Sequence, residues 1–145
     1  KKIISIVKKL VKNKIPVMGH LGILPQTDKK FTFKGKKTLE RNRILKEAKL
    51  LEAAGIFSIV LECIELKLSK VITNKLTIPT IGIGSSANCD GQVLVIDDLI
   101  GLSESKFRFV KKYVNMSKII NGAVRQYKLE VLRKQFPKSK HSFKN

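Results

Sequence analysis

The sequence predicts an α/β fold in which helices alternate with the strands of a parallel sheet. Segments with apolar residues at helical spacing alternate with short apolar runs that are typical of buried strands. These runs are apolar throughout, which favours a parallel sheet covered on both faces. A weak internal repeat supports this interpretation, because VKNKIPVMGHLG and ITNKLTIPTIGIG both pass from a helix through a lysine-containing turn into a strand with glycines. The length of 145 residues suits a single domain over residues 1–145.

The first predicted elements are a helix, a strand, a loop and a second helix. Residues 3–12 carry apolar side chains at helical spacing, and residues 14–19 form a short extended run. Residues 23–37 are polar and rich in lysine, so they predict a long loop. A helix over residues 38–54 follows, with Thr38 as its N-terminal cap and a glycine as its stop.

The rest of the chain predicts three more strands, three more helices and an irregular tail. The strands are expected at residues 56–62, 78–84 and 91–96. The helices are expected at residues 66–76, 105–115 and 117–134, the last of them capped by Ser117.

The formal net charge of +19 at pH 7 raises the question of a polyanionic partner such as RNA. The basic residues are spread along the chain, are almost all lysine, and do not interleave with aromatic residues. We therefore expect solvated surface lysines and no nucleic-acid partner, while a basic polyanion-binding module stays open as an alternative. No apolar run approaches the roughly 20 residues of a membrane span, so we expect no membrane partner and a cytoplasmic location.

Cysteine usage and glycine motifs exclude several classes of site. Cys63 and Cys89 form no CxxC pair, which argues against a zinc site or a disulfide framework and predicts two reduced thiols. Neither the GxGxxG pattern of dinucleotide-binding folds nor the GxxxxGK[ST] phosphate loop is present. A (β/α)8 barrel is favoured instead, because polar residues follow successive predicted strands, where that fold builds its active site. These residues are His20, Glu62, Ser85, Ser86, Asp97 and Asp98.

Glu62 is the strongest candidate for catalysis. It ends a mostly apolar run, where a carboxylate is partly removed from water in a setting that suits proton transfer. A strand-end glutamate can also simply turn to solvent or pair with a lysine. His20 could donate a hydrogen bond to a substrate oxygen, act as a base, or bond to the backbone in a turn. Asp97 and Asp98 could be an acidic pair or the polar end of a strand, and His141 is interpreted as a surface residue.

Longer strings around these residues resemble the ketopantoate hydroxymethyltransferase family. The matching strings are IPVMGHLGILPQ (15–26), AKLLEAAGIFSIVLECI (48–64), ITNKLTIPTIGIGSSANCDGQVLVIDDLIGL (72–102) and KFRFVKKY (106–113). In addition, QYKLEV…FPKSKHSF (126–143) resembles the end of that family's chain. Several separate motifs in the right order make the resemblance more specific than any one of them.

The resemblance implies both a fold and a reaction. The fold is a (β/α)8 TIM barrel of the phosphoenolpyruvate/pyruvate superfamily, of which this chain would be about the second half, strands five to eight. The reaction transfers a hydroxymethyl group from 5,10-methylenetetrahydrofolate to 2-oxoisovalerate and gives ketopantoate for pantothenate and coenzyme A biosynthesis. Glu62 would be the proton acceptor, and His20 would line the substrate pocket. Mg2+ would hold the oxo acid as a Lewis acid, and the family leads us to expect a homo-oligomer.

Departures from the family pattern qualify these expectations. The family's GDS, DLPF and KIEGG motifs do not occur here, so the resemblance implies that the metal ligands lie upstream of Lys1. The loop that usually reads GGYKVQG is KKFTFKGK at residues 29–36, and GIGAG is replaced by GIGSS. Half a barrel would expose sheet edges and apolar helix faces. We therefore expect this segment alone to be marginally stable and inactive, and an incomplete barrel fragment stays open as an alternative.

Overall fold

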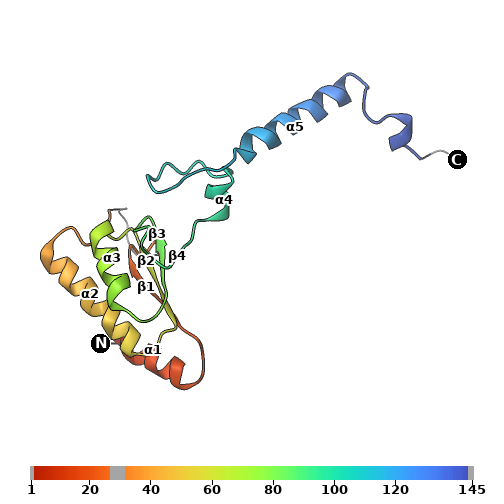
Figure 1. Ribbon diagram of the computed structural model, residues 1–145. Helices are drawn as coiled ribbons and strands as arrows, with labels where there is room; N and C mark the ends of the chain where they lie inside the picture. Colours follow the sequence, from red (N-terminus) through yellow and green to blue (C-terminus); the bar gives the residue numbers. More distant parts are fainter. Residues whose placement is uncertain (1, 27–31, 144–145) are drawn as a thin grey trace. The chain divides into compact units, whose positions relative to one another are not determined.

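The computed structural model describes residues 2–26 and 32–143, which fall into two compact units (Figure 1). The sheet unit comprises residues 1–93 and the tail unit comprises residues 94–145. The expectation of one domain over residues 1–145 stays a prediction.

The sheet unit is built on four parallel strands in the order β1-β2-β3-β4. The strands are β1 (Met18–Gly22), β2 (Ser58–Glu62), β3 (Thr80–Ile83) and β4 (Gly91–Gln92). In the register of the first pair, His20 lies opposite Val60 and Gly22 lies opposite Glu62. The carboxyl ends of β1 and β2 are therefore level, and both strands present their last residues at the same edge of the sheet.

Three helices cover one face of this sheet (Figure 1). They are α1 (Lys2–Lys12), α2 (Thr38–Ala53) and α3 (Leu66–Lys75). These helices and the strands between them confirm the predicted α/β class, and α1 and α3 lie within a residue or two of their predicted ranges.

The hydrophobic core lies between the helices and alternate residues of the strands. Ile59 and Leu61 of β2 are fully buried against Ala48 of α2 and Ile72 of α3. Since successive strand residues point to opposite faces, Val60 and its neighbours lie on the other face and do not belong to this core. Of the two faces that the sequence expects to be covered, helices cover one in the described residues of the sheet unit.

The structure shifts the start of two predicted elements. The first strand begins at Met18 and contains His20, whereas the sequence placed His20 beyond the strand end. Thr38 is the first residue of α2, and Lys37 occupies the cap position with no side-chain capping hydrogen bond. The entry to α2 is fixed instead by Glu40, whose carboxylate accepts a hydrogen bond from the backbone N–H of Gly35 at 2.7 Å.

The predicted strand at residues 91–96 is shorter than expected. β4 pairs with Ile81 and Gly82, and the N–H of Val93 donates the next hydrogen bond to the carbonyl of Gly82. β3 ends at Ile83, so the later residues have no further strand to pair with. The chain instead forms the short helix α4 (Ile96–Leu99).

The tail unit differs most from the sequence-based expectation. It contains α4, α5 (Met116–Leu132) and the short 3-10 helix η1 (Ser139–His141). The helix expected at residues 105–115 is wrong, because Tyr113 donates its backbone N–H to Leu99 instead of to its own turn. Asn115, not Ser117, caps α5 by accepting a hydrogen bond from the N–H of Lys118 at 2.9 Å.

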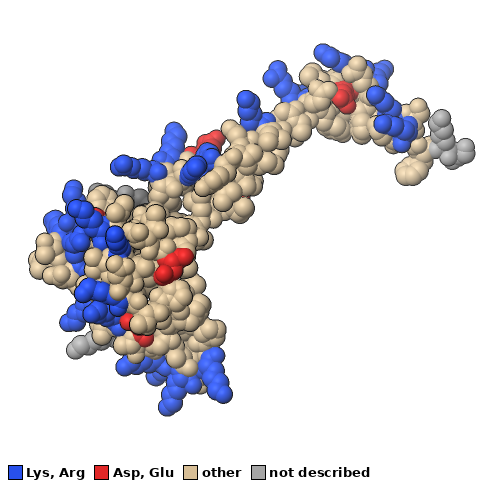
Figure 2. Space-filling model, in the orientation of Figure 1, with Lys and Arg blue, Asp and Glu red and all other residues tan. Residues whose placement is uncertain are grey.

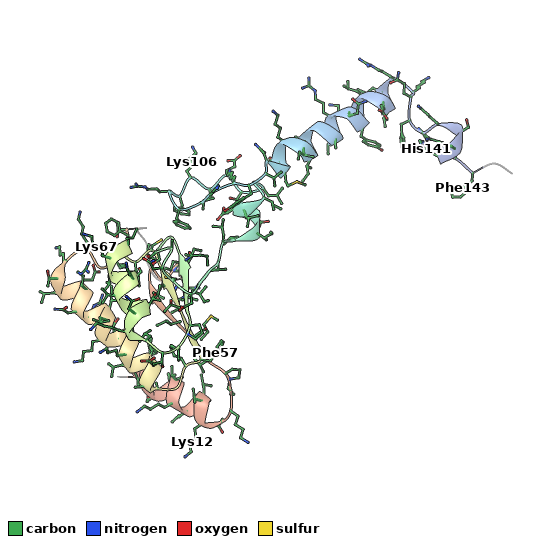
Figure 3. All side chains as sticks on the ribbon, viewed as in Figure 1. Lys12, Phe57, Lys67, Lys106, His141 and Phe143 are labelled. Atoms are coloured by element: carbon green, nitrogen blue, oxygen red, sulfur yellow. The ribbon has the colours of Figure 1, made fainter. Side chains whose placement is uncertain are left out.

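The end of the tail unit is held by aromatic contacts. The ring of Phe136 lies 5.5 Å from the ring of Tyr127 and 5.2 Å from the ring of His141, measured between centroids. His141 is exposed, as expected, and its Nδ1 accepts a hydrogen bond from the N–H of Lys138 (Figure 3). In the described part of the chain, no helix is long and apolar enough to cross a membrane.

Candidate active site

His20 of β1 and Glu62 of β2 meet at the carboxyl edge of the sheet. Nε2 of His20 lies 3.0 Å from Oε2 of Glu62. The parallel register explains the contact, because His20 and Glu62 stand two positions apart on adjacent strands and point to the same face. The side chain of Glu62 is 11% exposed and that of His20 is 34% exposed, so the pair is partly shielded from water.

The contact between the two side chains is close but poorly aligned for a hydrogen bond. Nε2 of His20 is buried and has no hydrogen bond of good geometry to any described residue, although a carboxylate oxygen lies 3.0 Å away. We take the proximity as an electrostatic contact, since a hydrogen bond weakens steeply when the N–H is not directed at its acceptor. The two side chains therefore do not satisfy each other's hydrogen-bonding capacity, and either could bond to a polar group of a bound molecule.

The end of β1 closes tightly on the end of β2. The N–H of Ile23 donates a hydrogen bond to the carbonyl of Glu62 at 3.0 Å. Gly22 has φ +110°, and a Cβ atom at this position would lie 1.8 Å from that same carbonyl oxygen. Only glycine permits this approach of the two backbones, so Gly22 helps to fix the backbone that carries the Glu62 carboxylate.

A sharp bend follows Glu62. Cys63 has φ +50°, in the left-handed region that residues with a side chain rarely adopt. Its N–H donates to the carbonyl of Ile83 at 2.8 Å, and its carbonyl accepts from the N–H of Lys34 at 2.8 Å. Burial, together with the nearby charge of Glu62, raises the pKa of the Cys63 thiol. This environment disfavours a reactive thiolate, and Cys63 and Cys89 are both free cysteines.

The sequence analysis did not identify a hydrogen-bonded ion pair beside this bend, which Arg41 and Glu65 form. Glu65 caps α3 through its carboxylate, which accepts hydrogen bonds from the N–H groups of Lys67 and Leu68, and Arg41 of α2 bonds to the same carboxylate at 2.5 Å. Glutamate is not among the preferred capping residues, so no capping signal marked it.

Of the altered loop at residues 29–36, residues 29–31 lie outside the described residues.

The two serines after β3 are used by the fold itself. The hydroxyl of Ser85 hydrogen bonds to the hydroxyl of Ser69 in α3. Ser86 is 2% exposed, and its hydroxyl accepts a hydrogen bond from the N–H of Asn88 at 3.1 Å. These contacts hold the turn after β3, which is a structural role.

The acidic pair does not follow a strand. Asp97 and Asp98 lie in the first turn of α4, because β4 ends at Gln92. The carboxylate of Asp98 accepts a hydrogen bond from the hydroxyl of Ser103 in the same unit. The expectation that the pair marks the end of a fourth strand is therefore wrong.

The described residues contain no cluster of side chains of the kind that binds a metal ion. Among residues 2–26 and 32–143, no group of three or more His, Cys, Asp or Glu side chains could hold a metal ion. The His, Cys, Asp and Glu side chains that are described therefore do not fit the Mg2+ site that the resemblance implies. The expectation that the metal ligands lie upstream of Lys1 stays a prediction.

The chain is similar in sequence to proteins of one known family. A sequence model of the family described as ketopantoate hydroxymethyltransferase matches residues 1–139. The chain belongs to the ketopantoate hydroxymethyltransferase family. This family has the TIM-barrel fold of the phosphoenolpyruvate/pyruvate superfamily, and parallel strands with helices on one face confirm the predicted fold class.

Individual relatives agree with the family match. The 3-methyl-2-oxobutanoate hydroxymethyltransferase of Pelagibacter ubique (strain HTCC1062) is 60% identical over 143 residues, which cover 99% of this chain and 56% of that relative. The protein of the same name from Syntrophus aciditrophicus (strain SB) is 49% identical over 142 residues, covering 94% of this chain and 52% of the relative. The chain therefore spans about half the length of the curated relatives it matches.

Proposed function

We propose that the protein containing this chain transfers a hydroxymethyl group from 5,10-methylenetetrahydrofolate to 2-oxoisovalerate and so forms ketopantoate. The observation that carries the proposal is the contact between His20 and Glu62 at the carboxyl edge of a parallel sheet, in a chain of this family. The active sites of TIM barrels lie at this edge. The activity belongs to the transferases of one-carbon metabolism.

Glu62 is the proton acceptor in this proposal. Its carboxylate takes the proton from C3 of 2-oxoisovalerate, and the electron pair of that C–H bond passes into the enolate. The enolate carbon then bonds to the methylene carbon of the folate as one of its two carbon–nitrogen bonds breaks, and the oxygen of a water molecule replaces the other nitrogen. The two nitrogens become N–H groups by taking up the proton that Glu62 accepted and the proton that water releases, so that the products are ketopantoate and tetrahydrofolate. Low exposure of the Glu62 side chain supports this role, since little water competes for the carboxylate.

His20 lines the substrate pocket in the same proposal. Its imidazole lies against the Glu62 carboxylate and has no well-aligned partner among the described residues, so it can present a polar group to a substrate oxygen. Mg2+, if the complete protein binds it, would supply Lewis-acid chemistry toward the oxo acid. The described residues do not form its site, and the proposal places its ligands upstream of Lys1.

The remaining expectations about the protein rest on its family. We propose a homo-oligomer and a cytoplasmic location on that basis. The basic surface does not favour the alternative of a polyanion-binding module. Figure 2 shows the Lys and Arg side chains spread over both units on the visible face, without a single basic patch.

Solvent exchange of the substrate proton tests the proposal directly. The native protein that contains this chain is mixed with 2-oxoisovalerate in D2O, and loss of the C3 proton signal is followed by NMR with and without the folate. We expect Glu62→Gln to slow exchange and ketopantoate formation by about 10^2- to 10^4-fold. The control is Glu52→Gln, at the opposite end of the sheet, where Glu52 accepts a hydrogen bond from the N–H of Thr77.

Two outcomes would overturn the proposal. One is a native protein that catalyses neither proton exchange nor ketopantoate formation, which would favour the incomplete-barrel alternative. The other is a Glu62→Gln variant that retains the activity of the Glu52→Gln control.

A further inference from the structure

We propose that Arg41 and Glu65 are positioning residues that clamp the segment Lys34-Gly35 against the bend after β2 and so hold Glu62 in place. The inference deepens the proposed function and rests on it, because Glu62 is the group being positioned. Neither residue contacts Glu62 in a hydrogen bond or ion pair within the described part of the chain. Their effect passes through the backbone of the intervening segment.

The bend needs support because its backbone conformation is unfavourable. Cys63 follows Glu62 directly and has φ +50°, which a residue with a Cβ atom adopts only when its surroundings enforce it. Two hydrogen bonds enforce it here: one from its N–H to the carbonyl of Ile83, and one to its carbonyl from the N–H of Lys34. The second bond comes from outside the strands, so it depends on the position of the Lys34-Gly35 segment.

The Lys34-Gly35 segment continues the pattern of the sheet beyond the end of β2. Lys34 forms a parallel bridge with Ile64, and its carbonyl accepts a hydrogen bond from the N–H of Glu65 at 2.9 Å. Gly35 has φ +86°, and a Cβ atom there would lie 2.5 Å from Cδ2 of Leu68 in α3. The segment therefore sits directly against α3, and the positive φ of Gly35 favours glycine at this position.

Arg41 and Glu65 join α2 to α3 next to this segment. One carboxylate oxygen of Glu65 accepts from Arg41 Nη1 at 2.5 Å and from the N–H of Leu68 at 2.9 Å, and the other accepts from the N–H of Lys67 at 3.0 Å. Lys67 is labelled in Figure 3 at this end of α3. The Arg41 and Glu65 side chains are 32% and 24% exposed. The clamp therefore ties the first turn of α2 to the first turn of α3.

The charge state of Glu65 suits this role. Burial alone would raise the pKa of Glu65, but the hydrogen bonds from Lys67 and Leu68, joined by Arg41, lower it below its ordinary value. The carboxylate is thus ionised at neutral pH, where it can accept a charge-assisted hydrogen bond from the guanidinium group.

Loosening the clamp would affect the reaction more than substrate binding. If the Lys34 N–H leaves the Cys63 carbonyl, the bend can relax and shift the Glu62 carboxylate away from its 3.0 Å contact with His20. A displacement of about 1 Å in a catalytic group can cost up to roughly 10^2-fold in rate. Neither clamp residue is proposed to contact the oxo acid, so its KM should change much less than kcat.

The test compares Arg41→Ala with Lys46→Ala in the native protein that contains this chain. Lys46 lies on the same helix, is exposed, and makes no hydrogen bond or ion pair with the residues that the structure describes. Arg43 is unsuitable as the control, because it lines a cavity together with His20. We expect Arg41→Ala to lower kcat about 10- to 100-fold, while the KM for the oxo acid changes by less than about threefold. Arg41→Lys should recover part of the loss, and Lys46→Ala should leave kcat within about twofold of the parent. Equal kcat values for the two alanine variants would overturn the inference.

A second readout does not depend on activity. Hydrogen exchange of the Lys34 and Glu65 amides, followed by NMR, should be at least about tenfold faster in Arg41→Ala than in Lys46→Ala, because the Lys34 amide bonds to the carbonyl of Cys63 and the Glu65 amide bonds to the carbonyl of Lys34. Unchanged exchange at these amides would overturn the clamp whatever the kinetics. If the parent protein fails to exchange the substrate proton, the proposed function fails, and the catalytic part of this inference fails with it.

Discussion

Gly22 shows how one residue can govern the candidate site without contributing a functional group. Its absent side chain lets the end of β1 approach the carbonyl of Glu62, and Ile23 then donates a hydrogen bond to that carbonyl. A side chain at position 22 would be strained by the positive φ, and its Cβ atom would clash with the backbone carbonyl of Glu62. Because the clashing atom belongs to the backbone, moving a flexible side chain cannot relieve the clash.

We predict that Gly22→Ala destabilises the protein by about 2–4 kcal/mol and reduces activity through displacement of Glu62. The measurement is urea unfolding together with the substrate proton-exchange assay. Gly122→Ala is the matched control, because a Cβ atom there meets nothing within 4 Å, and alanine is favoured over glycine in a helix. Equal stability of the two variants would contradict the prediction.

His20 is the second residue whose role can be measured. We predict that His20→Gln lowers the rate of ketopantoate formation by about 10- to 100-fold, because the imidazole beside Glu62 is lost. The control is His141→Gln in the tail unit, where the exposed imidazole accepts a hydrogen bond from the backbone of Lys138. A His20→Gln variant as active as the control would remove His20 from the substrate pocket.

At the scale of elements, hydrogen bonds between segments hold the strand ends in register. Asp90, just before β4, accepts hydrogen bonds from the N–H and the hydroxyl of Thr80 in β3 at 2.8 and 2.9 Å. The hydroxyl of Thr80 also contacts that of Thr73 in α3 at 2.9 Å. The Asp90 carboxylate thereby ties the start of β4 to β3, and the Thr80 hydroxyl links β3 to α3.

This arrangement predicts a pH dependence. The hydrogen bonds from Thr80 lower the pKa of Asp90 below its ordinary value of 3.8. The stabilisation is therefore fully present above that value and is lost as pH falls through the lowered pKa. Because Asp90 is exposed, we expect Asp90→Asn to cost only about 0.5–1 kcal/mol at pH 7 and the cost to shrink below about pH 4.

The measurement for Asp90 is the free energy of unfolding in urea between pH 3 and pH 7. Thr80→Val removes the hydroxyl donor, and in that background Asp90→Asn should cost less than in the parent. A cost of Asp90→Asn that is constant across the pH range would contradict the prediction.

At the scale of the whole molecule, much apolar surface stays exposed within each unit. Met18 on the uncovered face of the sheet is 47% exposed. In the tail unit, α5 has no buried residue, and Val124 and Leu132 are 60% and 69% exposed. Apolar surface of this extent usually marks a site of association or a source of aggregation.

We therefore predict that the isolated 145-residue chain is marginally stable and self-associates. Light scattering after size exclusion should give a mass that rises with concentration, and thermal unfolding should be broad. The full-length Pelagibacter ubique relative, treated identically, is the reference. A sharp, concentration-independent transition of a monomer would contradict this expectation.

The sequence by itself determined the fold class and the two candidate residues. Helical spacing located α1 and α3, apolar runs located β2 and β3, and longer motifs pointed to the family that the comparisons confirm. These features depend on the burial of residues near one another in the chain, which periodicity reports directly.

Tertiary structure alone decided which segments touch. It placed His20 inside β1, ended β4 at Gln92 for want of a partner strand, and joined Arg41 to Glu65 across the Lys34-Gly35 segment. These outcomes depend on strand register and on hydrogen bonds between residues far apart in the sequence. Local patterns do not contain that information, because each partner acquires its role only when folding brings the other within reach.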